Sequence, residues 1–126
     1  MTSTVLKQTR VSLTIPGKPV PLQRSRTRSG RHYLPKRSRE YRELVQAEWM
    51  RAGRPTLGDA NLLVSMRFYG ARANADLDNL CKALADALQG LAFSNDRQIT
   101  HYDHCSKLPA GDKGPRAEID LWAMAT

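Results

Sequence analysis

The hydrophobic pattern changes period several times along the 126 residues, and this succession constrains the fold more than any other feature of the sequence. Apolar residues on one face alternate with those on the other over residues 10–15 and 61–69, which predicts two strands, and two further strands are expected over 98–107 and 117–123. Helical spacing predicts one helix that begins at Ser38 as N-cap and stops at Gly53, and a second over 75–91. The order β-α-β-α-β-β favours an α+β, two-layer domain with two helices packed on a mixed sheet.

The length suits one ordinary domain, so we expect residues 1–126 to form a single unit. No apolar run approaches the ~18–20 residues of a membrane span, and residues 1–7 lack the apolar core of a signal peptide. The two cysteines, Cys81 and Cys105, are too few for a disulfide scaffold. We therefore expect a cytoplasmic protein that does not associate with membranes, in which Cys81 is a small packing residue.

The whole chain has 20 Lys and Arg against 12 Asp and Glu, which gives a net charge of +8. The positive charge is concentrated in its N-terminal part. Such clustering is typical of nucleic-acid binders. Prolines and glycines recur over residues 16–37, so the sequence predicts a mobile basic arm without regular structure that becomes ordered on phosphates. An uninvolved flexible loop is the alternative. The residues expected to contact DNA are Lys18, Arg24, Arg26, Arg28, Arg31, Lys36 and Arg37.

Acidic residues gather around the predicted second helix. Asp76 and Asp78 flank one apolar residue at its start, and in an extended chain their carboxylates would point the same way. Asp96 follows the helix, and Lys82 lies four residues after Asp78. Such carboxylates suit Mg²⁺, which commonly binds one or two of them plus a substrate phosphate, and a lysine can neutralise charge on phosphorus. Alternatively, Asp78 caps the helix, Lys82 pairs with Asp86, and Asp96 occupies a turn.

A second group of potential metal ligands lies in the third predicted strand. On a regular strand His101 and Cys105 would face one side and His104 the other, so the three cannot converge easily. No further cluster completes four ligands. We therefore do not expect a zinc site.

Several motifs follow one another in a fixed order. The central ones are Asp76-Leu77-Asp78-Asn79, Lys82, Asp86-Ala87-Leu88 and Asn95-Asp96-Arg97-Gln98-Ile99. Further towards the N-terminus are Gly17-Lys18-Pro19-Val20-Pro21, Tyr33-Leu34-Pro35 and Arg39-Glu40-Tyr41. With these motifs the chain resembles the RusA family of Holliday junction resolvases, and the resemblance covers roughly residues 11–122. The resemblance departs at Asn95, since the family usually has two acids where this chain has Asn95-Asp96.

The resemblance implies a small α+β, Mg²⁺-dependent, homodimeric endonuclease that resolves four-way DNA junctions by paired nicks, in recombination and repair, in bacteria and their phages. Mn²⁺ is expected to substitute for Mg²⁺. The family's metal-binding acids would fall on Asp76, Asp78 and Asp96, and its essential lysine on Lys82. We expect Asn79, Asp86 and Asn95 to orient these catalytic residues. Two alternatives stay open: a non-catalytic nucleic-acid-binding protein, and a nuclease that acts on forks or flaps.

Overall fold

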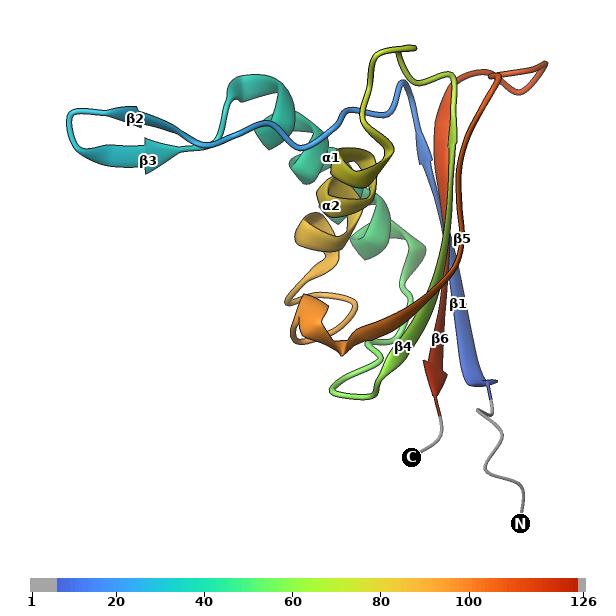
Figure 1. Cartoon of the computed structure of the whole chain (residues 1–126). Coiled ribbons are helices and arrows are strands. Elements are labelled where there is room, and N and C mark those ends of the chain that lie inside the picture. The colour runs from blue at the N-terminus through green and yellow to red at the C-terminus, as the bar shows by residue number, and fades with distance from the viewer. Residues whose placement is uncertain (1–6, 125–126) are drawn as a thin grey trace.

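The computed structural model describes residues 7–124 and confirms the α+β fold. Its main sheet has the order β1-β6-β4-β5 (Figure 1). The four strands are β1 (Lys7–Pro16), β4 (Leu62–Tyr69), β5 (Ile99–Leu108) and β6 (Arg116–Met124). The sheet is mixed because β5 runs parallel to β4, whereas the other neighbours are antiparallel. The parts of the expected domain at 1–6 and 125–126 lie outside the described residues.

Both helices, α1 (Lys36–Ala52) and α2 (Leu77–Leu88), cover the same face of this sheet (Figure 1). α2 buries Leu80, Leu84 and Leu88 against the strands, as its periodicity predicts. Because β4 and β5 are parallel, α2 is the crossover between them. Among the described residues, no helix is long and apolar enough to cross a membrane.

The ends of α1 are only partly as predicted. Gly53 adopts a left-handed conformation with φ 63° and closes the helix, as expected. The prediction of Ser38 as N-cap is wrong, because the helix already begins at Lys36 after Pro35. Ser38 is instead buried, and its hydroxyl accepts a hydrogen bond of 3.0 Å from the backbone N–H of Gln23. The serine therefore anchors the basic segment to α1.

The basic segment contains a hairpin that the sequence analysis missed. Strands β2 (Arg26–Arg28) and β3 (Arg31–Tyr33) pair with each other and extend away from the body of the molecule (Figure 1). Ser29 and Gly30 join them with φ 51° and 76°, the positive values that two-residue hairpin turns favour. The prediction of no regular structure over residues 16–37 is thus wrong for the hairpin at 26–33 and for Lys36 and Arg37, which begin α1.

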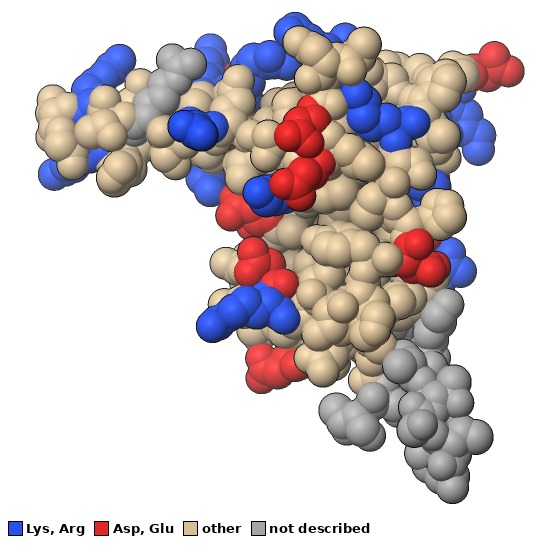
Figure 2. All heavy atoms as spheres, in the orientation of Figure 1, with Lys and Arg blue, Asp and Glu red and all other residues tan. Residues whose placement is uncertain are grey.

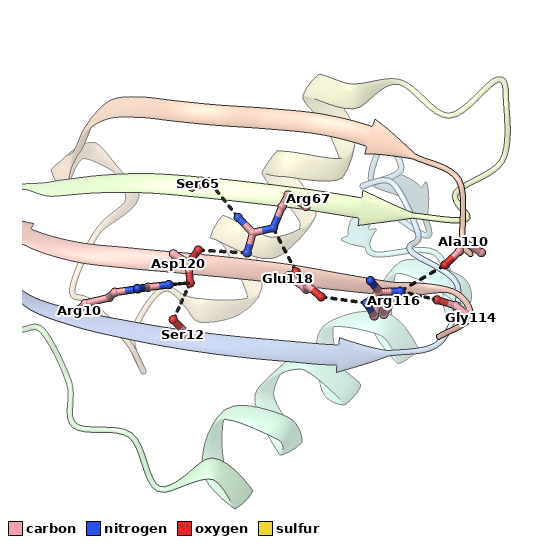
Figure 3. A network of polar contacts seen from close by, with 9 residues as sticks. All are labelled: Arg10, Ser12, Ser65, Arg67, Ala110, Gly114, Arg116, Glu118 and Asp120. Carbon is pink, nitrogen blue, oxygen red and sulfur yellow. Dashed lines mark hydrogen bonds and ion pairs between the residues drawn. The ribbon is translucent and has the colours of Figure 1, made fainter. Parts of the chain in front are cut away.

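The sheet face opposite the helices carries a network of charged side chains (Figure 3). The Arg67 guanidinium donates to Glu118 at 3.1 Å and to Asp120 at 3.0 Å. Asp120 is nearly buried and also accepts a hydrogen bond of 2.5 Å from Ser12. Burial opposes its ionisation, but the hydrogen bonds from Ser12, Arg67 and Arg10 outweigh burial and hold its pKa below the ordinary value. This face is therefore fastened by polar contacts across three strands.

Strand β5 does not alternate regularly. Its register with β4 shifts twice, so that His101 pairs with Leu63 and His104 with Ser65. Leu63 and Ser65 lie two residues apart on β4, so both histidines belong to the same face of the sheet. The expectation that they face opposite sides is wrong, because it assumed a strand without bulges. Cys105 pairs with Met66 and therefore belongs to the face that the helices cover. Both histidines lie on the opposite face, so Cys105 is still separated from them.

Candidate active site

The start of α2 is fixed by its own acids. Asp76 is the N-cap residue, and its carboxylate accepts a hydrogen bond of 2.9 Å from the backbone N–H of Asp78. The preceding loop is held by Lys107 of β5, whose ammonium donates to the carbonyls of Ala73 at 2.9 Å and Ala75 at 2.7 Å. No sequence signal indicated this role of Lys107. The two contacts position the first turn of α2 against the neighbouring strand.

A pocket of about 640 Å³ opens between α2 and β5, and several predicted site residues line it. On its rim the ammonium of Lys82 lies 3.1 Å from the carboxylate of Asp78, and both side chains are more than half exposed. An exposed pair of this kind contributes little to stability, so the two groups remain accessible to a ligand. The pocket is lined by Leu22, Leu77, Asp78, Cys81, Lys82, Ala85, Asp86, Asp96, Ile99, Tyr102 and Cys105.

Asp96 reaches this pocket from the turn that follows α2. It begins the short 3-10 helix η1 (Asp96–Gln98), whose N-cap is Asn95. The side-chain oxygen of Asn95 accepts a hydrogen bond of 2.9 Å from the backbone N–H of Arg97, and Gln98 reaches back to the N–H of Asn95 at 2.7 Å. Gln89 accepts from the N–H of Asp96 at 2.8 Å. Asn95 thus caps the turn in which Asp96 lies, and its expected role in orienting the catalytic residues stays a prediction.

The three predicted metal-binding acids are divided between two hollows. Asp78 and Asp96 line the pocket beside β5, whereas Asp76 lines a smaller one of about 270 Å³ together with Asn79 and Arg37. Their division follows from the backbone, because Asp76 is extended while Asp78 already lies in the helix. Among residues 7–124, no three His, Cys, Asp or Glu side chains lie close enough together to hold one metal ion. The metal-binding role of the three acids stays a prediction.

The sequence analysis offered an alternative in which these acids only cap α2 and form ion pairs. The structure contains such contacts, but they involve other residues than expected. Asp76, not Asp78, caps α2, and Lys82 pairs with Asp78 rather than with Asp86. Asp86 lies 3.7 Å from the guanidinium of Arg42 on α1. Asp86 therefore links the two helices at the edge of the pocket that Lys82 also lines.

Two thiols and a phenol complete the pocket. The interaction between the two thiols lowers the pKa of Cys105, and the same interaction together with burial raises the pKa of Cys81. Burial, together with nearby negative charge, raises the pKa of Tyr102 to about 12. Tyr102 is therefore a neutral hydrogen-bond donor at physiological pH.

The predicted DNA-binding residues lie along the projecting hairpin and its base, where Lys and Arg side chains are prominent, while acidic side chains gather on the adjoining body (Figure 2). Six of them are exposed, and within the described part of the chain they form no ion pair: Lys18, Arg24, Arg28, Arg31, Lys36 and Arg37. For Arg26 the structure gives the backbone position, opposite Tyr33 in the hairpin. Arg72, which the sequence analysis did not select, lines the smaller hollow beside Asp76 and Arg37.

A family model described as Endodeoxyribonuclease RusA matches residues 16–121. The chain belongs to the RusA family. The match includes the hairpin, both helices and every predicted site residue. Membership in the RusA family implies a hydrolase that cuts DNA internally and acts on Holliday junctions. Comparison with curated proteins finds no match.

Proposed function

We propose that this RusA-family protein is a Mg²⁺-dependent nuclease that resolves four-way DNA junctions by paired, symmetric nicks, and that it serves recombination and repair in the cytoplasm. The observation that carries the proposal is the pocket between α2 and β5, which Asp78 and Asp96 both line and in which Lys82 lies 3.1 Å from Asp78. Two carboxylates and one ammonium, accessible and next to a basic extension, are the groups that phosphodiester hydrolysis requires.

The donor set of the pocket fits Mg²⁺. This ion is usually held by one or two carboxylates, with substrate phosphate and water completing its shell, and Asp78 and Asp96 supply two carboxylates to one pocket. Asp76, on the adjoining hollow, is the third expected ligand. When bound, the ion would activate water and stabilise the leaving oxygen, and Mn²⁺ would serve in the same way.

Lys82 is proposed to act on the phosphate. Its ammonium lies 3.1 Å from Asp78 in the free protein and is exposed, so it can exchange this partner for a phosphate oxygen. There it would stabilise negative charge that increases in the transition state. Asn95 and Asp86 keep the surrounding backbone in place through the contacts of η1 and of α1.

The hairpin and the start of α1 are proposed to bind the arms of the junction. Unpaired Lys and Arg side chains release counterions when they contact phosphates, which gives affinity without sequence preference. We propose that two copies of the chain act together. A four-way junction needs two opposed nicks, and a dimer with a twofold axis supplies two identical pockets.

The direct test is nicking of a synthetic four-way junction by the purified protein, with and without Mg²⁺. We expect nicks only when the metal is present. Asp78→Asn and Asp96→Asn should abolish nicking while junction binding is kept or tightened, because each removes negative charge near phosphate. Asp59→Asn is the matched control, since Asp59 is exposed outside the pocket. Near wild-type nicking by either pocket variant would contradict the proposed site.

The same assay separates the alternatives. Equal cleavage of a fork or a flap at the same salt concentration would indicate a broader structure-selective nuclease. Tight junction binding without cleavage at any Mg²⁺ concentration would indicate a non-catalytic DNA-binding protein.

A further inference from the structure

Two thiols line the pocket between α2 and β5. Cys81 lies on α2 with 7% of its surface exposed, and Cys105 is half-buried on β5. Both line the pocket that also contains Asp78 and Lys82. Cys81 belongs to the hydrophobic core cluster, Cys105 packs against that cluster, and both are free thiols whose interaction raises the pKa of Cys81 and lowers that of Cys105. The interpretation of Cys81 as a packing residue alone does not account for this pairing.

We propose that Cys81 and Cys105 form a reversible redox pair, which hydrogen peroxide oxidises to an intramolecular disulfide that fixes α2 against β5. The two residues are 24 positions apart in the chain and reach each other only because α2 crosses over the strand on which Cys105 lies. Opening towards the pocket gives a small oxidant access to the pair.

The two cysteines have different roles in the proposed oxidation. Cys105 is the more accessible of the two thiols, and its interaction with Cys81 lowers its pKa, so Cys105 ionises first. A thiolate that reaches the surface is the form that reacts with peroxide. Cys81 is more deeply buried and stays protonated, so it acts second, as the resolving thiol.

The chemistry balances in two steps. The sulfur of Cys105 attacks one peroxide oxygen, the O–O bond breaks, and the departing hydroxide takes up a proton to give water, leaving a sulfenic acid on Cys105. The sulfur of Cys81 then attacks the sulfenic sulfur, the S–O bond breaks, and the thiol proton leaves with the hydroxyl group as water. The pair loses two electrons and two protons, and the peroxide becomes two waters. A dithiol reductant reverses the oxidation.

The disulfide would act on the catalytic groups through α2. Cys81 precedes Lys82 and lies within one turn of Asp78, so a covalent bond at Cys81 restrains the part of the helix that carries both. Bonded sulfurs lie about 2.05 Å apart, which draws the helix towards β5 and narrows the pocket. This consequence rests on the proposed function, whereas formation of the disulfide does not.

The test begins with the reduced full-length protein, freed of reductant and treated with hydrogen peroxide. We expect both thiols to disappear together, with a loss of about 2 Da in the monomer mass that dithiothreitol restores. Cys105→Ser should leave Cys81 free, and Cys81→Ser should leave Cys105 as a sulfenic acid that a dimedone probe captures. Cys81→Ala is the second variant in case a buried serine impairs folding.

Several outcomes would overturn the redox pair. These are two free thiols after peroxide treatment, a disulfide between two chains instead of within one, or oxidation of each cysteine without a cross-link. For the effect on activity, oxidation should slow junction nicking by about tenfold or more, reversibly, and leave the double variant Cys81→Ser/Cys105→Ser unaffected. A disulfide that leaves nicking unchanged would refute the effect on the pocket. If the reduced protein does not nick at all, the proposed function fails while the thiol measurement still decides the redox pair.

Discussion

The hairpin and the residues that flank it offer a quantitative test of DNA binding, in which three positive charges are removed at once. We choose Arg24→Ala, Arg31→Ala and Lys36→Ala in one variant, because all three side chains are exposed and form no ion pair among the described residues. Arg31 lies opposite Arg28 in the hairpin register, and this like-charge pairing means that its removal should not weaken the hairpin. Arg28 itself is kept, because its guanidinium lies 5.6 Å from the centre of the Tyr33 ring.

The expected loss of junction affinity in this triple variant follows from counterion release. Each phosphate contact contributes about 0.9 to the slope of log K against log salt, so the triple variant should lower the slope by about 2.7. At 0.1 M salt this corresponds to a loss of junction affinity of roughly two to three orders of magnitude, which should vanish near 1 M salt. The loss should be alike for junctions of different sequence, because phosphates carry no base identity.

The assay is a titration of a labelled junction over a series of salt concentrations without divalent metal. The matched control is Arg51→Ala/Arg54→Ala/Lys113→Ala, which removes the same charge from exposed positions outside the hairpin. We expect the control to change the slope by less than about one contact. An unchanged slope in the hairpin variant, or equal losses in both variants, would refute phosphate binding by the hairpin.

The remaining predictions concern the pocket, its turn, the sheet and the assembly. Lys82→Ala should reduce the single-turnover rate of nicking far more than junction affinity, and parallel losses in both measurements would make Lys82 a binding residue only. Asn95→Asp should remain active in a Mg²⁺ titration because aspartate caps equally well, whereas Asn95→Ala should lose about 1 kcal/mol of local stability and need more Mg²⁺. Asp120→Asn should lower the free energy of unfolding by about 2 kcal/mol at neutral pH in urea titrations. That difference should shrink as the pH falls through the depressed folded pKa of Asp120, because its stabilising effect is fully present only above the ordinary carboxyl pKa of about 3.9. Light scattering should give twice the 14.1 kDa chain mass, and a monomer both free and bound to a junction would contradict the proposed dimer.

Hydrophobic periodicity was sufficient to locate the helices and the inner part of the sheet, because α1, α2, β4 and β6 each bury apolar side chains. The hairpin escaped this criterion, since all three side chains of β3 are exposed and only the Ser29-Gly30 turn indicates the two strands. The irregularity of β5 escaped it as well. Its two register shifts depend on pairing with β4, which a single strand's sequence does not specify.

The candidate site was predictable in its residues but not in their grouping. The order of the motifs selected Asp76, Asp78 and Asp96, yet a backbone that is extended at one acid and helical at the next sends the first two into different hollows. Contacts that fix the site come from distant residues without a local signature. The hold of Lys107 on the loop before α2 is one example, and the meeting of Cys81 with Cys105 is another.

The base of the hairpin has a consequence for where the protein would cut. The backbone N–H of Leu22 donates to the carbonyl of Asn79 on α2 at 2.9 Å, and Gln23 is held by Ser38 on α1. The extension is therefore mounted on the same helices that carry and flank the acids, so the span from hairpin to pocket is a fixed length. The distance between the bound branch point and the nick would then be set by the distance between the hairpin and the pocket. We expect the nick to stand at a constant number of nucleotides from the branch point, and lengthening the segment between Gln23 and the hairpin should blur that position without moving the pocket.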